Sequence, residues 1–304
     1  MTKLILRNHQ SPGDVMAMTA AVENLFRVYP GKFEVDVRTT AWEIWENNPH
    51  ITPIASDDPD AQVIDCQYPL IHHCNGQAVH MIDAFVQHLA EQIKHPMRCV
   101  VNRPFVYLST DEQSWVDQVA QNFAYGRKVP FWIVNAGAKN DFPAKQWPVE
   151  HFQAVIDQTR GRITWVQVGA SEHDHPDLAG VIDLRGKTDT RQLIRLVYHS
   201  RGGIGPLSFL MHLAAALEKP YIAIGGGREP VQWNAYPKQH LLHSIGSLPC
   251  CERGACWRSK VIPQAGESTC ERPIYGLKKP VAECMARIRP SEVVSILERY
   301  ECAC

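Results

Sequence analysis

Residues 202–227 constrain the fold of this chain more than any other stretch, because three kinds of local sequence follow one another there. The stretch begins rich in glycine and reaches Pro206, a composition that does not sustain a helix and predicts a loop. Residues 209–217 are almost all apolar, which predicts a helix packed on most sides, with Ser208 as its N-cap. Residues 221–224 form a short apolar run typical of a buried parallel strand. The stretch therefore predicts an α/β fold.

The junction between this predicted loop and helix also suggests a function. The first amides of a helix have no intrahelical partner, and together with the helix dipole they favour a bound phosphate. A helix that only fills the core of an α/β domain would have the same sequence, so these residues alone leave both interpretations open.

The rest of the chain alternates predicted strands with predicted helices, which is typical of parallel sheets covered by helices. The predicted strands are residues 4–6, 33–37, 63–65, 131–135, 163–168 and 181–184. The predicted helices are residues 15–29, 81–93, 111–125, 151–158, 190–199 and 291–300. A length of 304 residues is long for one core, and residues 126–130 are typical of a hinge. We therefore expect two α/β domains that face each other across a cleft, with ligands at the carboxyl ends of the strands.

The charged residues nearly balance, with a formal net charge of −1 at pH 7, so the chain offers no basic field for nucleic acid. No apolar run approaches the ~20 residues that span a bilayer. The N-terminal residues lack a small-residue cleavage site, which favours a first strand over a signal peptide. We therefore expect a cytoplasmic protein that has no transmembrane segment and does not bind nucleic acid.

Ten cysteines would be unusual as disulfides in the cytoplasm, and seven of them follow residue 249. The segment that holds Cys250, Cys251, Cys256, Cys270 and Cys284 has little regular periodicity and cannot order itself by burial alone. A metal held by four thiolates would order it, and four sulfurs suit tetrahedral zinc or iron. The spacing is not that of paired CxxC motifs, so free buried cysteines are the alternative.

Four segments carry a resemblance to a known family. In chain order they are Gly13-Asp14-Val15, Asn135-Ala136-Gly137-Ala138 leading to Lys145-Gln146-Trp147-Pro148, Gly169-Ala170-Ser171-Glu172, and the helix at 211–217 with Lys219-Pro220. In their order and spacing they resemble glycosyltransferase family nine, the GT-B enzymes typified by ADP-heptose:lipopolysaccharide heptosyltransferases. The resemblance covers roughly residues 1–245.

This resemblance implies a GT-B fold, in which two Rossmann-like domains face a cleft. Residues 1–128 would be the N-terminal acceptor domain, and residues 129–248 the C-terminal nucleotide-sugar donor domain. Residues 249–304 would be a cysteine-rich metal-binding segment with a C-terminal helix. The reaction implied is an inverting transfer of a sugar, heptose in the typical members, from an ADP-linked donor to a hydroxyl of a glycan, lipopolysaccharide or protein. No catalytic metal is expected.

Asp14 matches the general base of the family, since inversion requires a carboxylate that takes the proton of the acceptor hydroxyl. The residues alone also allow Asp14 to cap a helix beginning at Val15. Lys145 matches the lysine that contacts the donor diphosphate, whereas a lysine without such a role would be a solvated side chain. Ser208 and the amides of the central helix would bind the same phosphate.

The other donor-binding residues that the resemblance implies are Asn135, Gly137, Glu172, Gly205 and His212. Glu172 matches a position that holds the ribose or base, and an exposed loop residue is its alternative. His212 would approach the diphosphate, and a satisfied core histidine is its alternative.

The chain departs from the family pattern just before the central helix. The family has Asp-Ser/Thr-Gly there, with the Asp on the donor sugar, whereas this chain has Leu207-Ser208-Phe209. The sugar-contacting carboxylate is missing, which puts heptose in doubt as the transferred sugar. After the next strand, Arg228 either meets phosphate or pairs with Glu229.

The cysteine segment resembles the cysteine finger of the bacterial autotransporter heptosyltransferases, relatives of family nine whose finger binds iron. Cys256-Trp257 and Glu283-Cys284 carry that likeness, although four residues rather than two separate Cys251 from Cys256. We expect a structural zinc or iron on Cys251, Cys256, Cys270 and Cys284, with Cys250 as an alternative ligand.

Two rival functions fit the same features. The first is a non-catalytic nucleotide-binding scaffold that uses the cysteine finger to bind a partner, which the missing carboxylate favours. The second is a GT-B sugar-nucleotide epimerase. Asp14 and Lys145 favour a transferase over a scaffold, because a scaffold has no need of a base that faces a phosphate-binding lysine.

Overall fold

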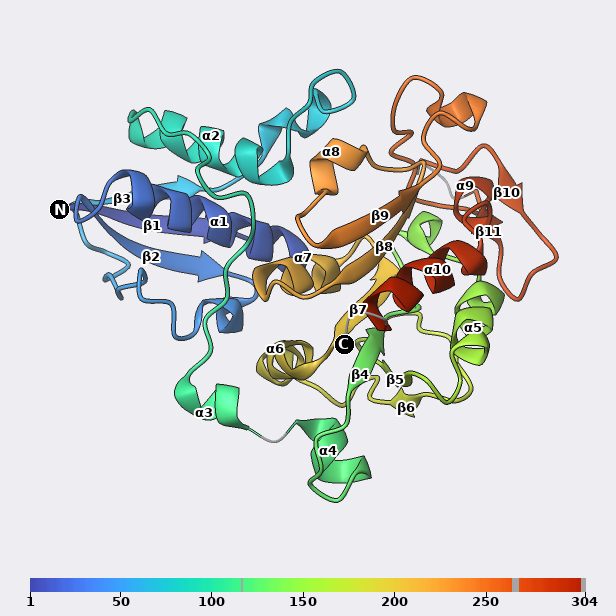
Figure 1. The fold of residues 1–304 in the computed structure, drawn as a ribbon. Coiled ribbons are helices and arrows are strands. Elements are labelled where there is room, and N and C mark those ends of the chain that lie inside the picture. The colour runs from blue at the N-terminus through green and yellow to red at the C-terminus, as the bar shows by residue number, and fades with distance from the viewer. Residues whose placement is uncertain (116, 264–267, 302–304) are drawn as a thin grey trace.

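Three parallel strands form the first sheet of the computed structural model, which describes residues 1–115, 117–263 and 268–301 (Figure 1). The strands are β1 (Thr2–Asn8), β2 (Phe33–Thr39) and β3 (Ala61–Asp65), in the spatial order β2-β1-β3. Leu4 of β1 pairs with Val35 of β2, and both side chains are buried. The three strands predicted in this half are therefore confirmed.

Helices α1 (Pro12–Val28) and α2 (Met81–Ile93) pack against each other and cover this sheet (Figure 1). The bounds of α2 are those predicted, but α1 begins earlier than predicted because Ser11 is its N-cap. The single helix predicted at 111–125 is wrong. Its described residues form α3 (Thr110–Ser114) and α4 (Gln118–Phe123), which have their own N-caps and are separated where Trp115 takes an extended backbone.

The second sheet has six parallel strands in the spatial order β6-β5-β4-β7-β8-β9. If β4 is counted as the first, this order reads 3-2-1-4-5-6, which is the order of a Rossmann fold. The strands are β4 (Phe131–Val134), β5 (Thr164–Gln167), β6 (Ile182–Asp183), β7 (Gly202–Pro206), β8 (Tyr221–Gly226) and β9 (Gln239–His243). The helices that connect them are α5 (Val149–Gln158), α6 (Thr190–His199), α7 (Phe209–Ala216) and α8 (Val231–Asn234).

Strand β7 replaces the loop that we predicted at the head of the central stretch, so that prediction is wrong. All five residues of β7 are buried between β4 and β8. Its glycines leave room for neighbouring aromatic rings: a Cβ added to Gly202 would lie 2.7 Å from the Trp132 ring, and one added to Gly203 would lie 3.0 Å from the Tyr221 ring. Packing between sheet neighbours, which composition does not reveal, therefore decides the conformation of this segment.

The two halves share one hydrophobic core, because α1 and α7 pack against each other. The contact begins at the first turns of both helices, where a Cβ added to Gly13 would lie 3.2 Å from Cδ2 of His212. Arg191 of α6 makes a second connection between the halves. Its guanidinium donates to both carboxylate oxygens of Glu112, at 2.9 and 2.6 Å, and to the backbone oxygen of Glu43 at 3.0 Å.

The segment after β9 returns to the second sheet (Figure 1). It holds a short 3₁₀ helix, η4 (Pro249–Cys251), the antiparallel pair β10 (Pro273–Ile274) and β11 (Val281–Ala282), and α9 (Glu283–Ala286). Helix α10 (Pro290–Glu301) then packs against α5, and its buried Val293 and Leu297 belong to the core on that side of the sheet. Cys302 and Cys304 lie outside the described residues.

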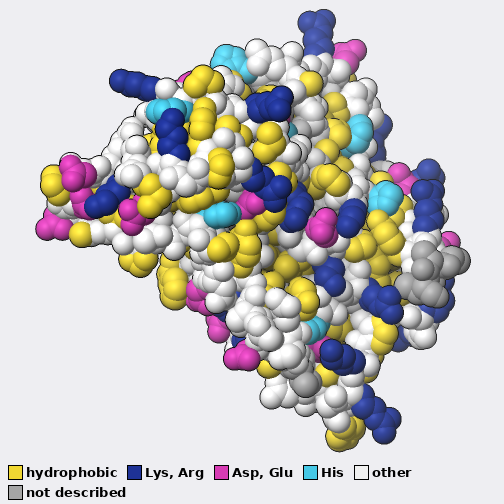
Figure 2. All heavy atoms as spheres, turned by 60° about the vertical axis from the view of Figure 1, so that its left-hand side comes forward, with side chains coloured by type: hydrophobic (Ala, Val, Ile, Leu, Met, Phe, Trp, Pro, Cys, Tyr) yellow, Lys and Arg dark blue, Asp and Glu magenta, His cyan; other side chains and the backbone are white. Residues whose placement is uncertain are grey.

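The surface carries acidic and basic side chains on the same face (Figure 2). This mixture agrees with the formal net charge of −1. Among the helices of the described residues, none is both long enough and apolar enough to cross a membrane.

Candidate functional site

Asp14 lies at the point where the strand order of the first sheet reverses, between β1 and β3. Ligands of parallel α/β sheets bind outside the carboxyl ends of the strands at such a point. Asp14 is in the first turn of α1, where its Oδ2 accepts from the backbone N of Ser11 at 3.1 Å. Its Oδ1 accepts from the hydroxyl of Tyr68, which follows β3, at 3.0 Å. The prediction that α1 begins at Val15, after an Asp14 held on a loop, is therefore wrong, and Asp14 is half-buried inside the helix.

Burial raises the pKa of the Asp14 carboxyl. The hydrogen bond from Tyr68, the positive charge of Lys145 and the amide of Ser11 act in the opposite direction but do not cancel this effect. Burial and the nearby Asp14 also raise the pKa of Tyr68, so this phenol keeps its proton and donates it to Asp14 in a hydrogen bond. A carboxylate with a raised pKa has a higher proton affinity than an exposed one, which suits a base.

The corresponding point of the second sheet lies between β4 and β7. Asn135 follows β4, and its Nδ2 donates to Oγ of Ser208 at the N-terminus of α7, at 3.3 Å. The Oδ1 of Asn135 accepts from the backbone N of Gly137 at 3.3 Å. Ser208 is the N-cap of α7, but its hydroxyl does not cap the helix amides. Three predicted donor-site residues therefore meet at one edge of the sheet.

Two predicted donor-site glycines are required by close packing at this edge. A Cβ added to Gly205 would lie 2.6 Å from the hydroxyl oxygen of Tyr221 and 2.7 Å from the backbone oxygen of Asn135. A Cβ added to Gly137 would lie 2.2 Å from both the backbone oxygen of Asp174 and Nδ1 of His175. Distances this short do not occur for real Cβ atoms, so neither position has space for a side chain.

Lys145 ends the short 3₁₀ helix η3 (Pro143–Lys145) and points to the same region. Its Nζ lies 2.7 Å from Oε1 of Glu229 and donates to the backbone oxygen of Leu207 at 3.3 Å. The alternative of a freely solvated side chain is therefore wrong for Lys145 in this structure. The charge of Lys145 lowers the pKa of the Asp14 carboxyl. The two strand-order reversals lie next to each other, because a Cβ added to Gly13 would lie 3.6 Å from the backbone N of Phe209 at the start of α7.

Glu229 follows β8 and is buried. Besides Lys145, it is paired with Arg228, and its Oε2 accepts from Nδ2 of Asn234 at 2.9 Å. Burial alone would raise the pKa of Glu229, but the charges of Lys145 and Arg228 prevail and lower it to about 2. Of the two roles considered for Arg228, the structure therefore has the pairing with Glu229.

His212 lies in the first turn of α7 and is buried where α1 meets α7. Its Nδ1 lies 2.8 Å from the hydroxyl of Tyr236. Burial lowers the pKa of His212 to about 3, so the imidazole is neutral at pH 7 and contributes a hydrogen bond rather than a charge. Of its two predicted roles, this environment is that of a satisfied core histidine.

Glu172 lies on the loop after β5, where its side chain is exposed and Oε2 accepts from the hydroxyl of Ser171 at 3.3 Å. The same loop carries His175, whose ring lies against the backbone of Gly137 and Gly169. Burial lowers the pKa of His175 to about 4. The loop thus crosses the carboxyl ends of β4 and β5, although the side chain of Glu172 itself contacts solvent.

Two residues of this site, Tyr68 and Glu229, were not predicted as site residues. Each lies three residues beyond the carboxyl end of a strand, Tyr68 after β3 and Glu229 after β8. The rule that ligands bind at the carboxyl ends of strands was therefore the signal that could have identified them. The sequence places both within a few residues of strands that were predicted.

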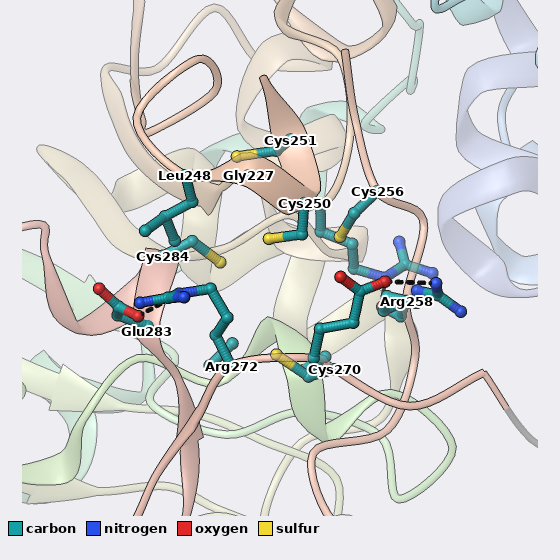
Figure 3. Close-up of a pocket in the computed structure, with 14 residues that line it drawn as sticks. Gly227, Leu248, Cys250, Cys251, Cys256, Arg258, Cys270, Arg272, Glu283 and Cys284 are labelled. Carbon is teal, nitrogen blue, oxygen red and sulfur yellow. Dashed lines mark hydrogen bonds and ion pairs between the residues drawn. The ribbon is translucent and has the colours of Figure 1, made fainter. Parts of the chain in front are cut away.

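Five cysteines line one pocket at the end of β8 (Figure 3). They are Cys250, Cys251, Cys256, Cys270 and Cys284. The pocket is closed on one side by β8 and its loop, since a Cβ added to Gly227 would lie 2.7 Å from Sγ of Cys251. Burial and neighbouring thiols raise the pKa values of Cys250 and Cys284 to about 11, so both are protonated without a metal.

The cysteine sulfurs of the pocket are ligands that suit a metal that prefers thiolates, but in this structure they are not arranged as a metal site. Within the described residues, no group of three or more His, Cys, Asp or Glu side chains is arranged to hold a metal ion. The predicted metal finger is therefore present as a cysteine-lined pocket and not as a ligand set.

Several solved structures with the same fold are glycosyltransferases. A glycosyltransferase of family 9 from Veillonella parvula DSM 2008 has a TM-score of 0.67 at 14% identity, covering 100% of this chain and 98% of that one. ADP-heptose lps heptosyltransferase II of E. coli has a TM-score of 0.61 at 16% identity, covering 99% of each chain. The iron-containing dodecameric glycosyltransferase TibC from enterotoxigenic E. coli H10407 has a TM-score of 0.67 at 16% identity, covering 99% of this chain and 77% of that one. The fold is thus the α/β fold with parallel sheets of GT-B glycosyltransferases.

The family model described as glycosyltransferase family 9 (heptosyltransferase) matches residues 74–256, which is more than half of the chain. The chain belongs to this family and is a glycosyltransferase, as the resemblance of its motifs predicted. No curated protein sequence matches the chain. Lys145 and the residues around α7 lie within the matched range, whereas Asp14, Cys270 and Cys284 lie outside it.

Proposed function

We propose that this glycosyltransferase transfers a sugar with inversion from a nucleoside-diphosphate donor to an acceptor hydroxyl, with Asp14 as the general base. One observation carries the proposal: the first turn of α1, which holds Asp14, lies against the start of α7, where Lys145 donates to the backbone oxygen of Leu207 at 3.3 Å. A carboxylate of raised pKa opposite a lysine is what an attacking hydroxyl and a departing diphosphate require.

In the proposed reaction, the acceptor hydroxyl gives its proton to Asp14 as its oxygen attacks the anomeric carbon of the donor. The bond between that carbon and the diphosphate oxygen breaks, and the nucleoside diphosphate leaves. Lys145 and the amides at the N-terminus of α7 stabilise the charge that develops on the diphosphate. Ser208 and Asn135, which are hydrogen-bonded to each other at this edge, orient the same phosphates. Gly137, Gly205 and Glu172 complete the proposed donor site, and the buried His212 supports it from the core beneath the first turn of α7.

The first candidate for the donor is ADP-heptose. Family membership supports it, and the similar proteins of known structure include E. coli WaaC with ADP and TibC in complex with ADP-D-beta-D-heptose. Leu207 and Phe209 replace the residues of the family that precede the central helix, and Leu207 is buried. The transferred sugar therefore has to be tested separately from the nucleotide. For the acceptor we propose a hydroxyl of a glycan, a lipopolysaccharide core or a protein.

We further propose that residues 1–128 and 129–248 are acceptor and donor domains that face a cleft, and that residues 249–304 are an accessory segment. The sheet of each half and its strand-order reversal support this division. Eight cysteines of the described residues are free thiols, which suits the reducing cytoplasm as the compartment.

A structural zinc or iron is the proposed occupant of the cysteine-lined pocket, held by Cys251, Cys256, Cys270 and Cys284, with Cys250 as an alternative. The gathering of these side chains around one space supports it (Figure 3), as does the description of TibC as iron-containing. When bound, the metal would keep the thiols deprotonated and hold the segment in place. The test is the metal content of protein purified under reducing conditions. Cys270→Ser should lose the metal and Cys99→Ser, outside the pocket, should keep it.

The experiment that tests the proposed function is calorimetric binding of ADP, UDP and GDP to the wild type and to Lys145→Ala. Selective binding of ADP that weakens in Lys145→Ala supports the proposed donor site. ADP-heptose turnover is then measured with a lipopolysaccharide core oligosaccharide and with a serine-containing peptide as acceptors. If none of the three nucleotides binds, the proposal fails and a role for the cysteine-lined pocket in partner binding becomes the better hypothesis.

A further inference from the structure

Among the residues that the structure describes, Glu229 is the acidic side chain that pairs with the proposed diphosphate lysine. Its Oε1 lies 2.7 Å from Nζ of Lys145, and the carboxylate is almost wholly buried, with 7% of the residue exposed. Arg228 pairs with the same oxygen, and Asn234 donates to Oε2 at 2.9 Å. Three donors therefore fix this carboxylate, and Lys145 is one of them.

The other end of Arg228 is fixed by the cysteine segment. Its Nε donates to the backbone oxygen of Arg258 at 2.7 Å, and its guanidinium lies over the rings of Phe142, at 5.1 Å, and Trp257, at 5.7 Å. The backbone N of Trp257 donates to the backbone oxygen of Arg228 at 3.0 Å. Because Arg228 is held on both sides, Glu229 cannot follow Lys145 if that side chain moves toward a ligand.

Lys145 has a backbone partner at a position where the family has a carboxylate. Its Nζ donates to the backbone oxygen of Leu207, the residue that stands in place of the family Asp. The carboxylate next to Lys145 is that of Glu229, which comes from the loop after β8.

We propose that Glu229 is a positioning residue, which acts through Lys145 as the counter-ion that the donor diphosphate has to displace. The inference rests on the proposed function of Lys145. In the free protein, Glu229 neutralises Lys145 and holds its ammonium toward the N-terminus of α7. A diphosphate that binds this ammonium brings negative charge next to a fixed buried carboxylate, and like charges in a desolvated site repel strongly. Nucleotide affinity is therefore set by the exchange of one anion for another on Lys145, and the return of Lys145 to the fixed Glu229 favours release of the product diphosphate.

The experiment is calorimetric titration of ADP into the wild type and Glu229→Gln. The amide keeps the size of the side chain and an oxygen that accepts hydrogen bonds, but it removes the competing charge. We expect Glu229→Gln to bind ADP about tenfold more tightly than the wild type, as expected for a difference of about 1.4 kcal/mol. In the Lys145→Ala background the same substitution should increase ADP affinity by a smaller factor than in the wild type, because the counter-ion then has no lysine to neutralise and only its direct repulsion of the diphosphate is relieved. Adenosine, which has no phosphate, should bind both proteins equally.

Glu23→Gln is the matched control. Glu23 is also buried and paired, with Arg27 at 2.6 Å, but it lies far along α1 from the first turn. Its substitution should leave ADP affinity unchanged. If Glu229→Gln does not fold, as judged by circular dichroism, Glu229→Asp serves instead. It draws the carboxylate away from Lys145 by one methylene and should bind ADP more tightly than the wild type.

The outcomes separate this inference from the proposed function. If the wild type binds ADP and a folded Glu229 variant binds it equally or more weakly, the counter-ion role is refuted and the proposed function stands. A merely structural role for Glu229 would give that weaker binding. If the wild type binds no nucleotide, the proposed function fails and the counter-ion role fails with it.

Discussion

Asp14→Asn is expected to remove most of the transfer activity while leaving the fold intact. The introduced amide would keep an oxygen that accepts from the backbone N of Ser11 or from the hydroxyl of Tyr68, which bind the two oxygens of Asp14 at 3.1 and 3.0 Å. It would lose the ability to take a proton. A positioned general base typically contributes 10²–10⁴-fold to the rate, so we expect kcat to fall by about that factor.

The raised pKa of Asp14 determines how stability and activity depend on pH. Because burial raises this pKa, folding favours the protonated carboxyl, and its stabilising contribution is present below the pKa of the unfolded chain and lost as pH rises. At pH 7 ionised Asp14 therefore lowers the stability of the wild type, an effect that is absent from Asp14→Asn. The midpoint of thermal unfolding should stay within about 4 °C of the wild type or increase. Wild-type kcat should fall as pH decreases through the raised pKa of Asp14, and the residual activity of the variant should lack this acid limb.

The assay is release of ADP from ADP-heptose in the presence of the acceptor, measured from about pH 4 to about pH 9, with thermal unfolding of both proteins as the control. A folded Asp14→Asn protein that retains more than about one tenth of the wild-type kcat would refute the assignment of the base. An acid limb that persists unchanged in the variant would show that another group causes it.

Three further predictions concern stability. Gly137→Ala should lower the free energy of unfolding in urea by about 1–3 kcal/mol, because its Cβ would lie 2.2 Å from the backbone oxygen of Asp174. Gly76→Ala is the control and should change this free energy little, because the atom nearest to its Cβ would lie at 3.8 Å. Arg191→Ala should lower the free energy of unfolding in urea by about 3–5 kcal/mol, because it leaves Glu112 without the guanidinium that connects the two halves. An unchanged midpoint of urea unfolding would contradict this role of Arg191. Removal of the proposed metal with a thiophilic chelator should lower the thermal midpoint, and equal midpoints with and without metal would argue against a structural role.

Much of the fold could be predicted because local sequence and tertiary packing agree along most of the chain. Helix α2 has the predicted bounds, and the strands predicted from apolar runs all form. The exceptions are segments whose conformation depends on distant neighbours. The glycines of β7 carry no strand propensity, and the segment is a strand because the rings of Trp132 and Tyr221 fill the space that its missing side chains leave. At 111–125, helical periodicity continued past Trp115, but the capping residue Asp117 starts a new helix.

The residues of the candidate site likewise fall into two groups: those that the sequence could identify and those that only tertiary packing brings to the site. Asp14, Lys145 and Ser208 could be predicted because they belong to motifs with a fixed place after a strand or before a helix. Glu229 and Tyr68 are neighbours of these residues only through packing between elements that lie far apart along the chain. The environment of a residue is even less visible in sequence. A histidine at position 212 is compatible with a phosphate site or with a core position. In the structure His212 is buried against Gly13 and therefore belongs to the core.

The contact between α1 and α7 determines whether Asp14 and Lys145 can face each other. Gly13 directly precedes Asp14, and a Cβ there would lie 3.2 Å from Cδ2 of the buried His212. A side chain at position 13 would therefore push the first turns of the two helices apart or displace the histidine. Because Leu207, whose backbone oxygen accepts from Lys145, stands just before α7, such a shift would also move Lys145 away from Asp14. The glycine next to the proposed base thus contributes by its lack of a side chain, which lets the two strand-order reversals approach.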